Sequence, residues 1–328
     1  MGNCCSQKSV QRNDSSTSQA PHRVDFKIEP PNIPEIEIKK LELFPSGTGG
    51  LGDVWKCSWS RQSGTSKVNT SANGWGFTIS TIFKVAVKSV RIPQAGDTQV
   101  VDRASKRIRR EAYVWITLVH DNILTFNGII DGFGLLPALV SPWMENGSLD
   151  VYLKQGHVPS KGDKLRMLRQ IAAGLKYLHD KGVVHGDLTC TNVLINDDGK
   201  LCLADFGLSM ILAESQNSTF NSCHPGNVRW MAPEMLAMPE PGGVVVPTKA
   251  ADVYSYGCIM LQLFCGHVPY RWLTQAFHVI AARVAGIEPF RQITDVEEGH
   301  KEYSLKCISV NVGDRPGASG IVEFLGAE

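Results

Sequence analysis

Apolar and polar positions divide the chain into a first part that favours strands and a second part that favours helices. Four short segments rich in β-branched or aromatic residues are typical of strands: 41–44, 53–59, 83–90 and 139–144. Before the last of these, apolar residues recur every three or four positions from Val101 to Val119, which predicts one amphipathic helix. We interpret the polar, Gly- and Ser-rich segment 60–81 as a long loop between two strands; the alternative is retained non-coding sequence in the gene model.

Helical patterns dominate the second part. The apolar positions from Leu165 to His179 lie on one helix face, and Gly182 is expected to end that helix. Two apolar runs flank the turn Asn196–Gly199 and predict a hairpin. The apolar stretch Asp252–Phe264, followed by Gly266, predicts a buried helix. The fold class is therefore α+β, with a small mostly β lobe before a larger mostly α lobe.

The chain also divides by composition. Residues 1 to about 30 are polar and hold almost no large apolar side chains, so burial cannot offset the entropy of ordering them. Pro30, Pro31 and Pro34 then favour a stiff, extended linker. We divide the chain into a disordered tail and linker over 1–35, a smaller lobe with its hinge over 36–145, and a larger lobe over 146–328.

Charge and cysteine usage exclude several classes. The 33 basic and 32 acidic side chains nearly cancel, so no basic excess draws the chain to nucleic acid. The nine cysteines are odd in number and none form C-x-x-C, which favours buried free thiols in the cytoplasm over disulfides or a zinc site. No apolar run reaches 18 residues, so we expect no transmembrane helix.

The extreme N-terminus has the pattern of an acylation signal. Gly2 and Ser6 fit M-G-x-x-x-[ST], which predicts a myristoylated Gly2, and Cys4 and Cys5 are placed for palmitoylation. Two acyl chains would anchor the protein stably on the cytoplasmic face of a membrane, whereas one alone binds marginally. The alternative is an unmodified start.

A glycine-rich run is the first candidate for chemistry. Residues 47–52 match G-x-G-x-x-G, and glycines allow backbone N–H groups to approach phosphate oxygens. The same pattern occurs in dinucleotide-binding proteins, where it opens a helix. Here a predicted strand follows, so a glycine-rich β-hairpin over a nucleotide is favoured, with a plain turn as the alternative.

A lysine and a glutamate form the second candidate. Lys88 ends the strand Val85–Lys88, where it can pair with nucleotide phosphates. Glu111 borders the apolar stripe of the next helix, and an acid on the buried side of a helix needs a cationic partner. Lys88 is the natural candidate. The alternatives are a surface lysine and a solvated helix charge.

Three further motifs follow in order: His185–Leu188 with Asn192 after it, Asp205–Gly207, and Ala232–Glu234. One carboxylate in a loop can orient a hydroxyl group, and a second carboxylate with an amide oxygen can hold a hard cation such as Mg²⁺. Each tripeptide alone would occur by chance. Their order, on the expected strand and loop positions, makes chance negligible.

With these motifs the chain resembles a eukaryotic-type protein kinase, from about Leu41 to Leu325. The sequences of 228–234 and 252–257 resemble those of the tyrosine-kinase-like group of Ser/Thr kinases. The resemblance implies a bilobal fold and transfer of the γ-phosphoryl group of ATP, with Mg²⁺, to a protein Ser or Thr hydroxyl, or to Tyr. A nucleotide-binding pseudokinase acting as a signalling scaffold is the alternative.

The resemblance also implies a role for each matching residue. Asp187 would be the catalytic carboxylate, Lys88 would contact the α- and β-phosphates, and Asn192 and Asp205 would hold Mg²⁺. Ser141 would be the gatekeeper. The residues implied at the ATP site are Gly47, Thr48, Gly49, Gly50, Gly52, Val54, Ala86, Lys88, Glu111, Ser141, Pro142, Met144 and Leu194. Structural contacts would be a Glu234–Arg315 ion pair and a stack of Trp115, His185 and Phe206.

Three departures from the family pattern cluster on the acceptor side. Gly186 stands where the family usually has Arg, Thr189 where Ser/Thr kinases carry Lys, and Asn227 where Thr is usual. Thr191 also lacks the Arg of many tyrosine kinases. Loss of one cation near developing charge would slow transfer by about 10²–10³-fold. The ATP side is therefore expected to be intact and the acceptor side altered.

Overall fold

The computed structural model describes residues 29–49, 52–66, 77–91, 98–206, 227–236, 245–294 and 296–326. The predicted disordered tail, the acylation positions Gly2, Cys4 and Cys5, and the glycine-rich residue Gly50 lie outside these ranges. In the described ranges, no helix combines the length and the hydrophobicity needed to cross a bilayer.

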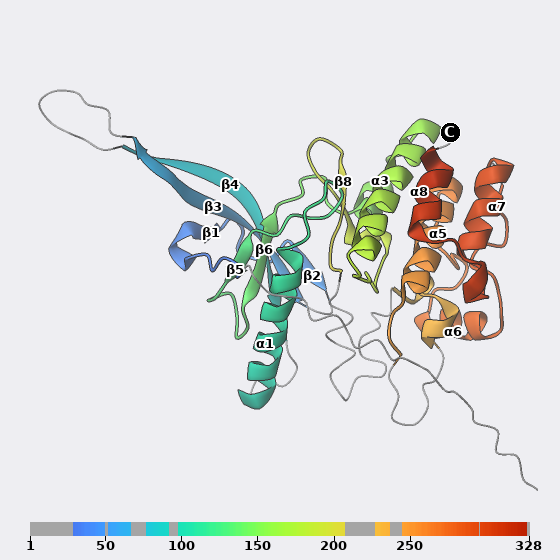
Figure 1. The fold of residues 1–328 in the computed structure, drawn as a ribbon, viewed down its shortest axis with the longest axis horizontal. Helices are drawn as coiled ribbons and strands as arrows, with labels where there is room; N and C mark the ends of the chain where they lie inside the picture. The colour runs from blue at the N-terminus through green and yellow to red at the C-terminus, as the bar shows by residue number, and fades with distance from the viewer. Residues whose placement is uncertain are drawn as a thin grey trace, which may run out of the picture.

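The smaller lobe is built on one antiparallel sheet, shown in Figure 1. Its strands run in the order β1-β3-β4-β6-β5, and β2 pairs with β3 beside this path. Buried apolar side chains such as Cys57, Val85, Val87 and Val140 form one side of its core. The strands are β1 (Ile38–Lys40), β2 (Gly47–Gly49), β3 (Gly52–Ser66), β4 (Phe77–Val90), β5 (Gly128–Ile130) and β6 (Ala138–Pro142).

Helix α1 (Thr98–Trp115) covers the sheet through the predicted apolar stripe. Ile108 and Ala112 are buried against residues of β5 and β6. The helix ends at Trp115 rather than at Val119, whose side chain is 81% exposed. The Trp115 indole N–H donates to the carbonyl of Leu124 (2.7 Å), which ties the end of the helix to the turn that follows.

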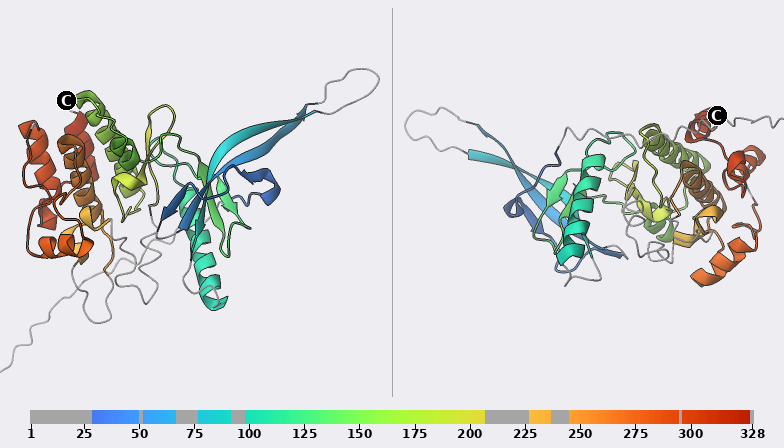
Figure 2. Two further views of the ribbon diagram at one scale, coloured as in Figure 1. Left: turned by 180° about the vertical axis from the view of Figure 1, so that it is seen from behind. Right: turned by 60° about the horizontal axis from the view of Figure 1, so that its bottom comes forward.

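Two predictions in this lobe are wrong. Residues 41–44 form a bend, not a strand: after the Leu41 N–H donates to the Lys56 carbonyl, the chain leaves β3 and Leu43 is 91% exposed. Most of the predicted loop 60–81 is strand instead. Residues 60–66 of β3 pair with 77–82 of β4, and the two form the long twisted ribbon that projects from the lobe in Figures 1 and 2.

The expected linker belongs in part to this lobe. The Ile33 N–H donates to the Ile129 carbonyl (2.8 Å), and the Ile129 N–H donates to the Pro31 carbonyl (2.8 Å). Ile33 is buried in the core of the sheet. Residues 31–33 are therefore held against β5 rather than forming a free spacer.

The larger lobe is helical and is centred on α5, whose side chains are buried from Ala251 to Leu263. Gly266 ends it, as predicted, whereas its start lies before Asp252, where Thr248 caps it. Gly182 follows the end of α3, as predicted. Helix α3 lies beside α8 and α5 beside α7 (Figure 1). The helices are α2 (Leu149–Lys154), α3 (Lys161–Asp180), α5 (Lys249–Cys265), α6 (Ala276–Val284), α7 (Glu298–Cys307) and α8 (Ala318–Gly326).

Short elements complete the two lobes. The predicted hairpin is formed by β7 (Val193–Ile195) and β8 (Leu201–Leu203), which pair antiparallel. The 3₁₀ turns are η1 (Glu35–Glu37), η2 (Cys190–Asn192), η3 (Asn227–Arg229), η4 (Pro233–Leu236) and η5 (Val312–Asp314). The predicted α+β class with a small β lobe and a larger α lobe is therefore confirmed.

Candidate active site

Four polar side chains from both lobes meet where the lobes join. Lys88 comes from β4, and its Nζ lies 2.6 Å from Oδ1 of Asp205, two residues after the end of β8. Asn192 lies in η2 and donates from Nδ2 to the backbone carbonyl (2.7 Å) and to Oδ2 (3.2 Å) of Asp187. Sequence motifs more than 100 residues apart thus contribute to one site.

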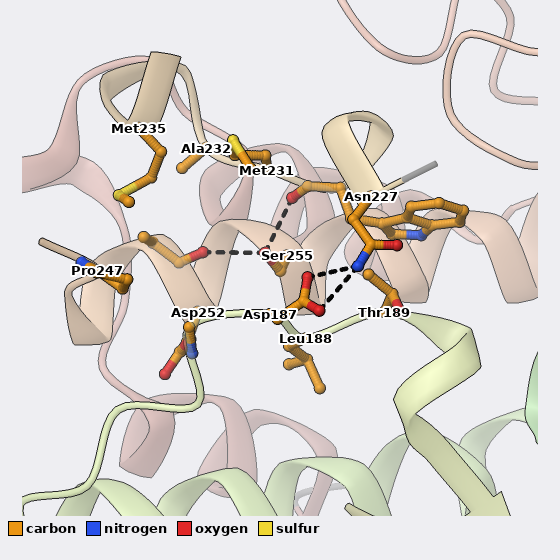
Figure 3. Close-up of a pocket in the computed structure, with 13 residues that line it drawn as sticks. Asp187, Leu188, Thr189, Asn227, Met231, Ala232, Met235, Pro247, Asp252 and Ser255 are labelled. Atoms are coloured by element: carbon orange, nitrogen blue, oxygen red, sulfur yellow. Dashed lines mark hydrogen bonds between the residues drawn. The ribbon is translucent and has the colours of Figure 1, made fainter. Parts of the chain in front are cut away.

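Asp187 is held by a second amide. Nδ2 of Asn227 donates to both carboxylate oxygens of Asp187, at 2.7 and 2.8 Å (Figure 3). Burial raises the pKa of Asp187 to about 7, although the hydrogen bonds from Asn227 and Asn192 act to lower it. A carboxyl group whose pKa lies near neutrality is suited to exchange a proton with a hydroxyl group.

The backbone before Asp187 is fixed by a buried acid of α5. Asp252 accepts from the backbone N–H groups of His185 and Gly186, both at 2.8 Å, and lies 2.8 Å from Nε2 of His179. Gly186 has φ of 77°, in the left-handed region that glycine adopts without steric cost. Glycine at position 186, where the family usually has Arg, therefore suits the backbone conformation of the loop.

Asp205 also has a left-handed backbone, with φ of 59°, which is uncommon for a residue other than glycine. Such strain is stored where the surrounding structure fixes it, and functional sites are the usual places. The next residue, Phe206, contacts Trp115 edge-on at 5.6 Å and His185 at 6.2 Å between ring centroids. The predicted aromatic stack is therefore formed.

The predicted Lys88–Glu111 ion pair is wrong for this structure. Both carboxylate oxygens of Glu111 are buried and have no hydrogen-bond partner among the described residues, because Lys88 is paired with Asp205 instead. Burial raises the pKa of Glu111 to about 8; the Lys88 charge lowers it and the Asp205 charge raises it further. An unpaired acid in such surroundings favours its protonated form.

The comparisons with known proteins agree with this geometry. A family model described as protein tyrosine and serine/threonine kinase matches residues 45–325. The chain belongs to this kinase family. The match covers both lobes and every motif of the site.

Curated relatives support the assignment. The kinase domain is 32% identical over 240 residues to mitogen-activated protein kinase kinase kinase 1 of Arabidopsis thaliana, covering 72% of this chain and 37% of that protein. It is 30% identical over 243 residues to serine/threonine/tyrosine-protein kinase HT1 of the same plant, covering 74% and 59%. It is 33% identical over 241 residues to rat (Rattus norvegicus) ephrin type-A receptor 5, covering 71% and 23%. The matches thus span less than two thirds of each relative.

The glycine-rich run lies where a nucleotide-binding hairpin was expected. Gly47 pairs with Val54 and Thr48 with Asp53, so β2 and β3 form a hairpin, as predicted, rather than a turn that opens a helix. A Cβ atom at Gly52 would lie 2.0 Å from the Ser89 carbonyl oxygen. The close approach of β3 to β4 therefore requires glycine at 52, independently of any phosphate.

The residues expected around the adenine lie on β4, on β6 and in the segment after it. Ala86 pairs with the buried Ser141. Pro142 ends β6, and the N–H of the next residue, Trp143, donates to the Lys84 carbonyl.

Met144 is buried in an apolar cluster that also contains Leu194 of β7. The same cluster includes Leu124, Cys202 and Ala204. Met144, two residues after β6, and the β7–β8 hairpin thus share one apolar cluster, of the kind that a purine ring would contact.

The donor set fits a magnesium ion shared with a nucleotide. Asn192 uses its amide nitrogen for Asp187, which leaves its amide oxygen for a cation, and Asp205 supplies a carboxylate. Within the described residues, no group of three or more His, Cys, Asp or Glu side chains is arranged to hold a metal. Asn192 and Asp205 would hold Mg²⁺ only together with phosphate oxygens, where the ion neutralises phosphate charge.

The acceptor side carries features that sequence reasoning missed. Thr189 is 1% exposed, and its hydroxyl lies 2.6 Å from that of Thr191. Together with Asp187 and Asn227 it lines a small pocket beneath η3 (Figure 3). The hydrogen bonds of Asn227 and the role of Asp252 join residues at least 40 positions apart, so no local pattern signalled them.

Proposed function

We propose that this domain is an active protein kinase that transfers the γ-phosphoryl group of ATP to a Ser or Thr hydroxyl of a protein. The observation that carries the proposal is the meeting of Lys88, Asp187, Asn192 and Asp205 at one site. In this proposal Lys88 binds the α- and β-phosphates, and Asp187 accepts the hydroxyl proton. The name of the HT1 relative includes serine, threonine and tyrosine, so it supports Ser, Thr and Tyr acceptors alike; the preference for Ser or Thr in this proposal comes from the sequences of 228–234 and 252–257.

The test is a phosphorylation assay of the full chain with Mg²⁺-ATP. We expect transfer by the parent and its loss in Lys88→Met, because the substitution removes the ammonium group that binds phosphate. The matched control is Lys84→Met on the same strand, whose side chain is 59% exposed and pairs with Glu145. Equal activity in the parent and in Lys88→Met would contradict the proposal.

The second candidate is a nucleotide-binding scaffold without phosphoryl transfer. It is favoured by the neutral Thr189 and by the amide hydrogen bonds that already occupy both oxygens of Asp187. ATP would then raise the melting temperature of the chain, since a ligand that binds only the folded state stabilises it, yet no substrate would be phosphorylated.

We further propose that acylation of Gly2, Cys4 and Cys5 holds the kinase on the cytoplasmic face of a membrane. The support is the sequence motif. Substituting Gly2→Ala should move the protein from the membrane fraction to the soluble fraction of expressing cells. A parent protein that never enters the membrane fraction, or a variant that remains there, would refute this proposal.

A further inference from the structure

The segment 185–228, which contains Asp187, is acidic. Between His185 and Val228 the sequence contains one lysine or arginine, Lys200, against five acids. Lys200 lies next to β8, and its Nζ pairs with Asp121 at 2.9 Å. The five acids are Asp187, Asp197, Asp198, Asp205 and Glu214.

The pocket beside Asp187 lacks a cation. Of the 13 residues that line it, none is lysine or arginine, whereas Asp187 and Asp252 are acids (Figure 3). The sequence segments 207–226 and 237–244 on either side of η3 and η4 also contain no lysine or arginine, and they add two acids, Glu214 and Glu240. Neither the described lining nor the adjoining segments therefore contain a permanently charged cation; their one histidine is His224.

Among the described residues, the lysine and arginine side chains near this pocket bind other partners. Lys88 pairs with Asp205. The Arg315 guanidinium binds both carboxylate oxygens of Glu234, at 2.6 and 2.8 Å. The Arg229 guanidinium donates to three backbone carbonyls in the segment that follows α5.

Arg283 is similarly occupied. It is 5% exposed, donates to the Arg229 carbonyl, and lies about equally far from the rings of Tyr254 and Tyr270, 5.2 and 5.1 Å from their centroids. Moving the Arg283 guanidinium to the pocket beside Asp187 would break both ring contacts.

Phosphoryl transfer places negative charge on the transferring group, and no lysine or arginine lines this pocket to neutralise it. The acceptor oxygen forms a bond to the γ-phosphorus while the bond to the β–γ bridging oxygen breaks, ADP leaves with that electron pair, and the hydroxyl proton passes to Asp187. Negative charge on the transferring group thus lies near the acids of the site. Thr189, which lines the pocket beside Asp187, contributes only a hydroxyl group.

We propose that the substrate supplies the missing cation: the preferred acceptor is a Ser or Thr flanked closely by lysine or arginine. The basic side chain lies against the pocket formed by Asp187, Thr189 and Asn227 and neutralises charge on the transferring phosphoryl group. This inference rests on the proposed kinase activity. It names a basic protein segment as the substrate class.

The test compares Ser/Thr peptide pools that are identical except for arginine or alanine next to, or two positions from, the acceptor. The full chain should phosphorylate the arginine pools at least tenfold faster in kcat/KM, and salt should reduce the preference because the attraction is electrostatic. Thr189→Lys should raise the rate on the alanine pools about tenfold or more and reduce the preference. Thr189→Met, which has similar length and no charge, should not raise it.

The outcomes separate the two proposals. Equal rates on arginine and alanine pools by the parent would overturn the inference and leave the kinase activity standing. An equal gain from Thr189→Met and Thr189→Lys would also overturn it, because size rather than charge would then explain the effect. No transfer to any pool by the parent or by Thr189→Lys would overturn the proposed function and the inference together.

Discussion

At the scale of single residues, Asn227 is the polar group that most directly controls Asp187. Its amide hydrogen bonds lower the pKa of Asp187 against the effect of burial. A base acts in its ionised form, so activity falls as the pH drops through that pKa. Asn227→Ala should raise the pKa and move the acidic limb of kcat/KM to higher pH.

The pH profile of kcat/KM checks this prediction. Asn227→Thr is the conservative comparison, because its hydroxyl group can still donate to Asp187 and should keep the limb nearer its original position. A purely structural role would lower activity equally at every pH. If the acidic limb of the Asn227→Ala profile stays where it is in the parent, Asn227 does not lower the pKa of Asp187.

Glu111 gives a second residue-scale prediction. Because its pKa is raised above that of an unfolded chain, to about 8, ionisation in the folded state is unfavourable. The contribution of Glu111 to the free energy of unfolding is therefore full below its pKa in the unfolded chain. It is lost as the pH rises through its pKa in the folded protein. Glu111→Gln stays neutral, so the variant should lose less stability than the parent between pH 5 and pH 9.

Urea unfolding at several pH values measures this difference. We expect the stability curves of parent and variant to diverge by a few kcal/mol across that range. Parallel curves would show that Glu111 is paired and ionised in the folded protein.

At the scale of elements, an ion pair with a buried arginine joins η4 to the residue after η5. The Arg315 side chain is fully buried, and Glu234 is its acidic partner. Removing one partner leaves an uncompensated buried charge, which is far more costly than losing a surface pair. Glu234→Ala should lower the free energy of unfolding by about 3 kcal/mol.

Thermal or urea unfolding tests this, with Asp102→Ala as the matched control. Asp102 pairs with Lys106 on the exposed face of α1, where side chains are 64% and 75% exposed, so its loss should cost less than about 1 kcal/mol. Equal losses in both variants would indicate that the Glu234–Arg315 pair is not structurally important.

The elements also show how far sequence patterns reach. Long periodic patterns such as Leu165–His179 and Asp252–Phe264 predicted α3 and α5, because burial along one face or all round specifies a helix. Segment 41–44 looked like a strand, yet strand pairing is a long-range choice and β3 pairs with Ile38–Lys40 instead. Residues 60–66 carry no apolar pattern, and in 77–81 only Phe77 and Ile79 are apolar, next to the Gly- and Ser-rich residues that favoured a loop. The two segments become strands by pairing with each other.

At the scale of the whole molecule, the site depends on both lobes at once. Motif order was enough to predict that Lys88 and Asp205 would approach each other, because each motif has a fixed place on its strand or loop. The sequence could not predict which acid Lys88 would bind, since Asp205 and Glu111 compete for one ammonium group. The sequence also could not predict that Asp252 accepts hydrogen bonds from the backbone of His185 and Gly186, because these residues are 67 and 66 positions from it.

The proposed phosphoryl transfer depends on proton acceptance by Asp187 at the junction of the two lobes. The decisive measurement is single-turnover transfer from saturating Mg²⁺-ATP to a substrate peptide, by the parent and by Asp187→Asn. We expect a rate about 10²–10⁴-fold lower in the variant, with ATP affinity within about twofold of the parent because the substitution leaves Lys88 and Asp205 in place. A variant that transfers phosphate at the parent rate would contradict this role of Asp187.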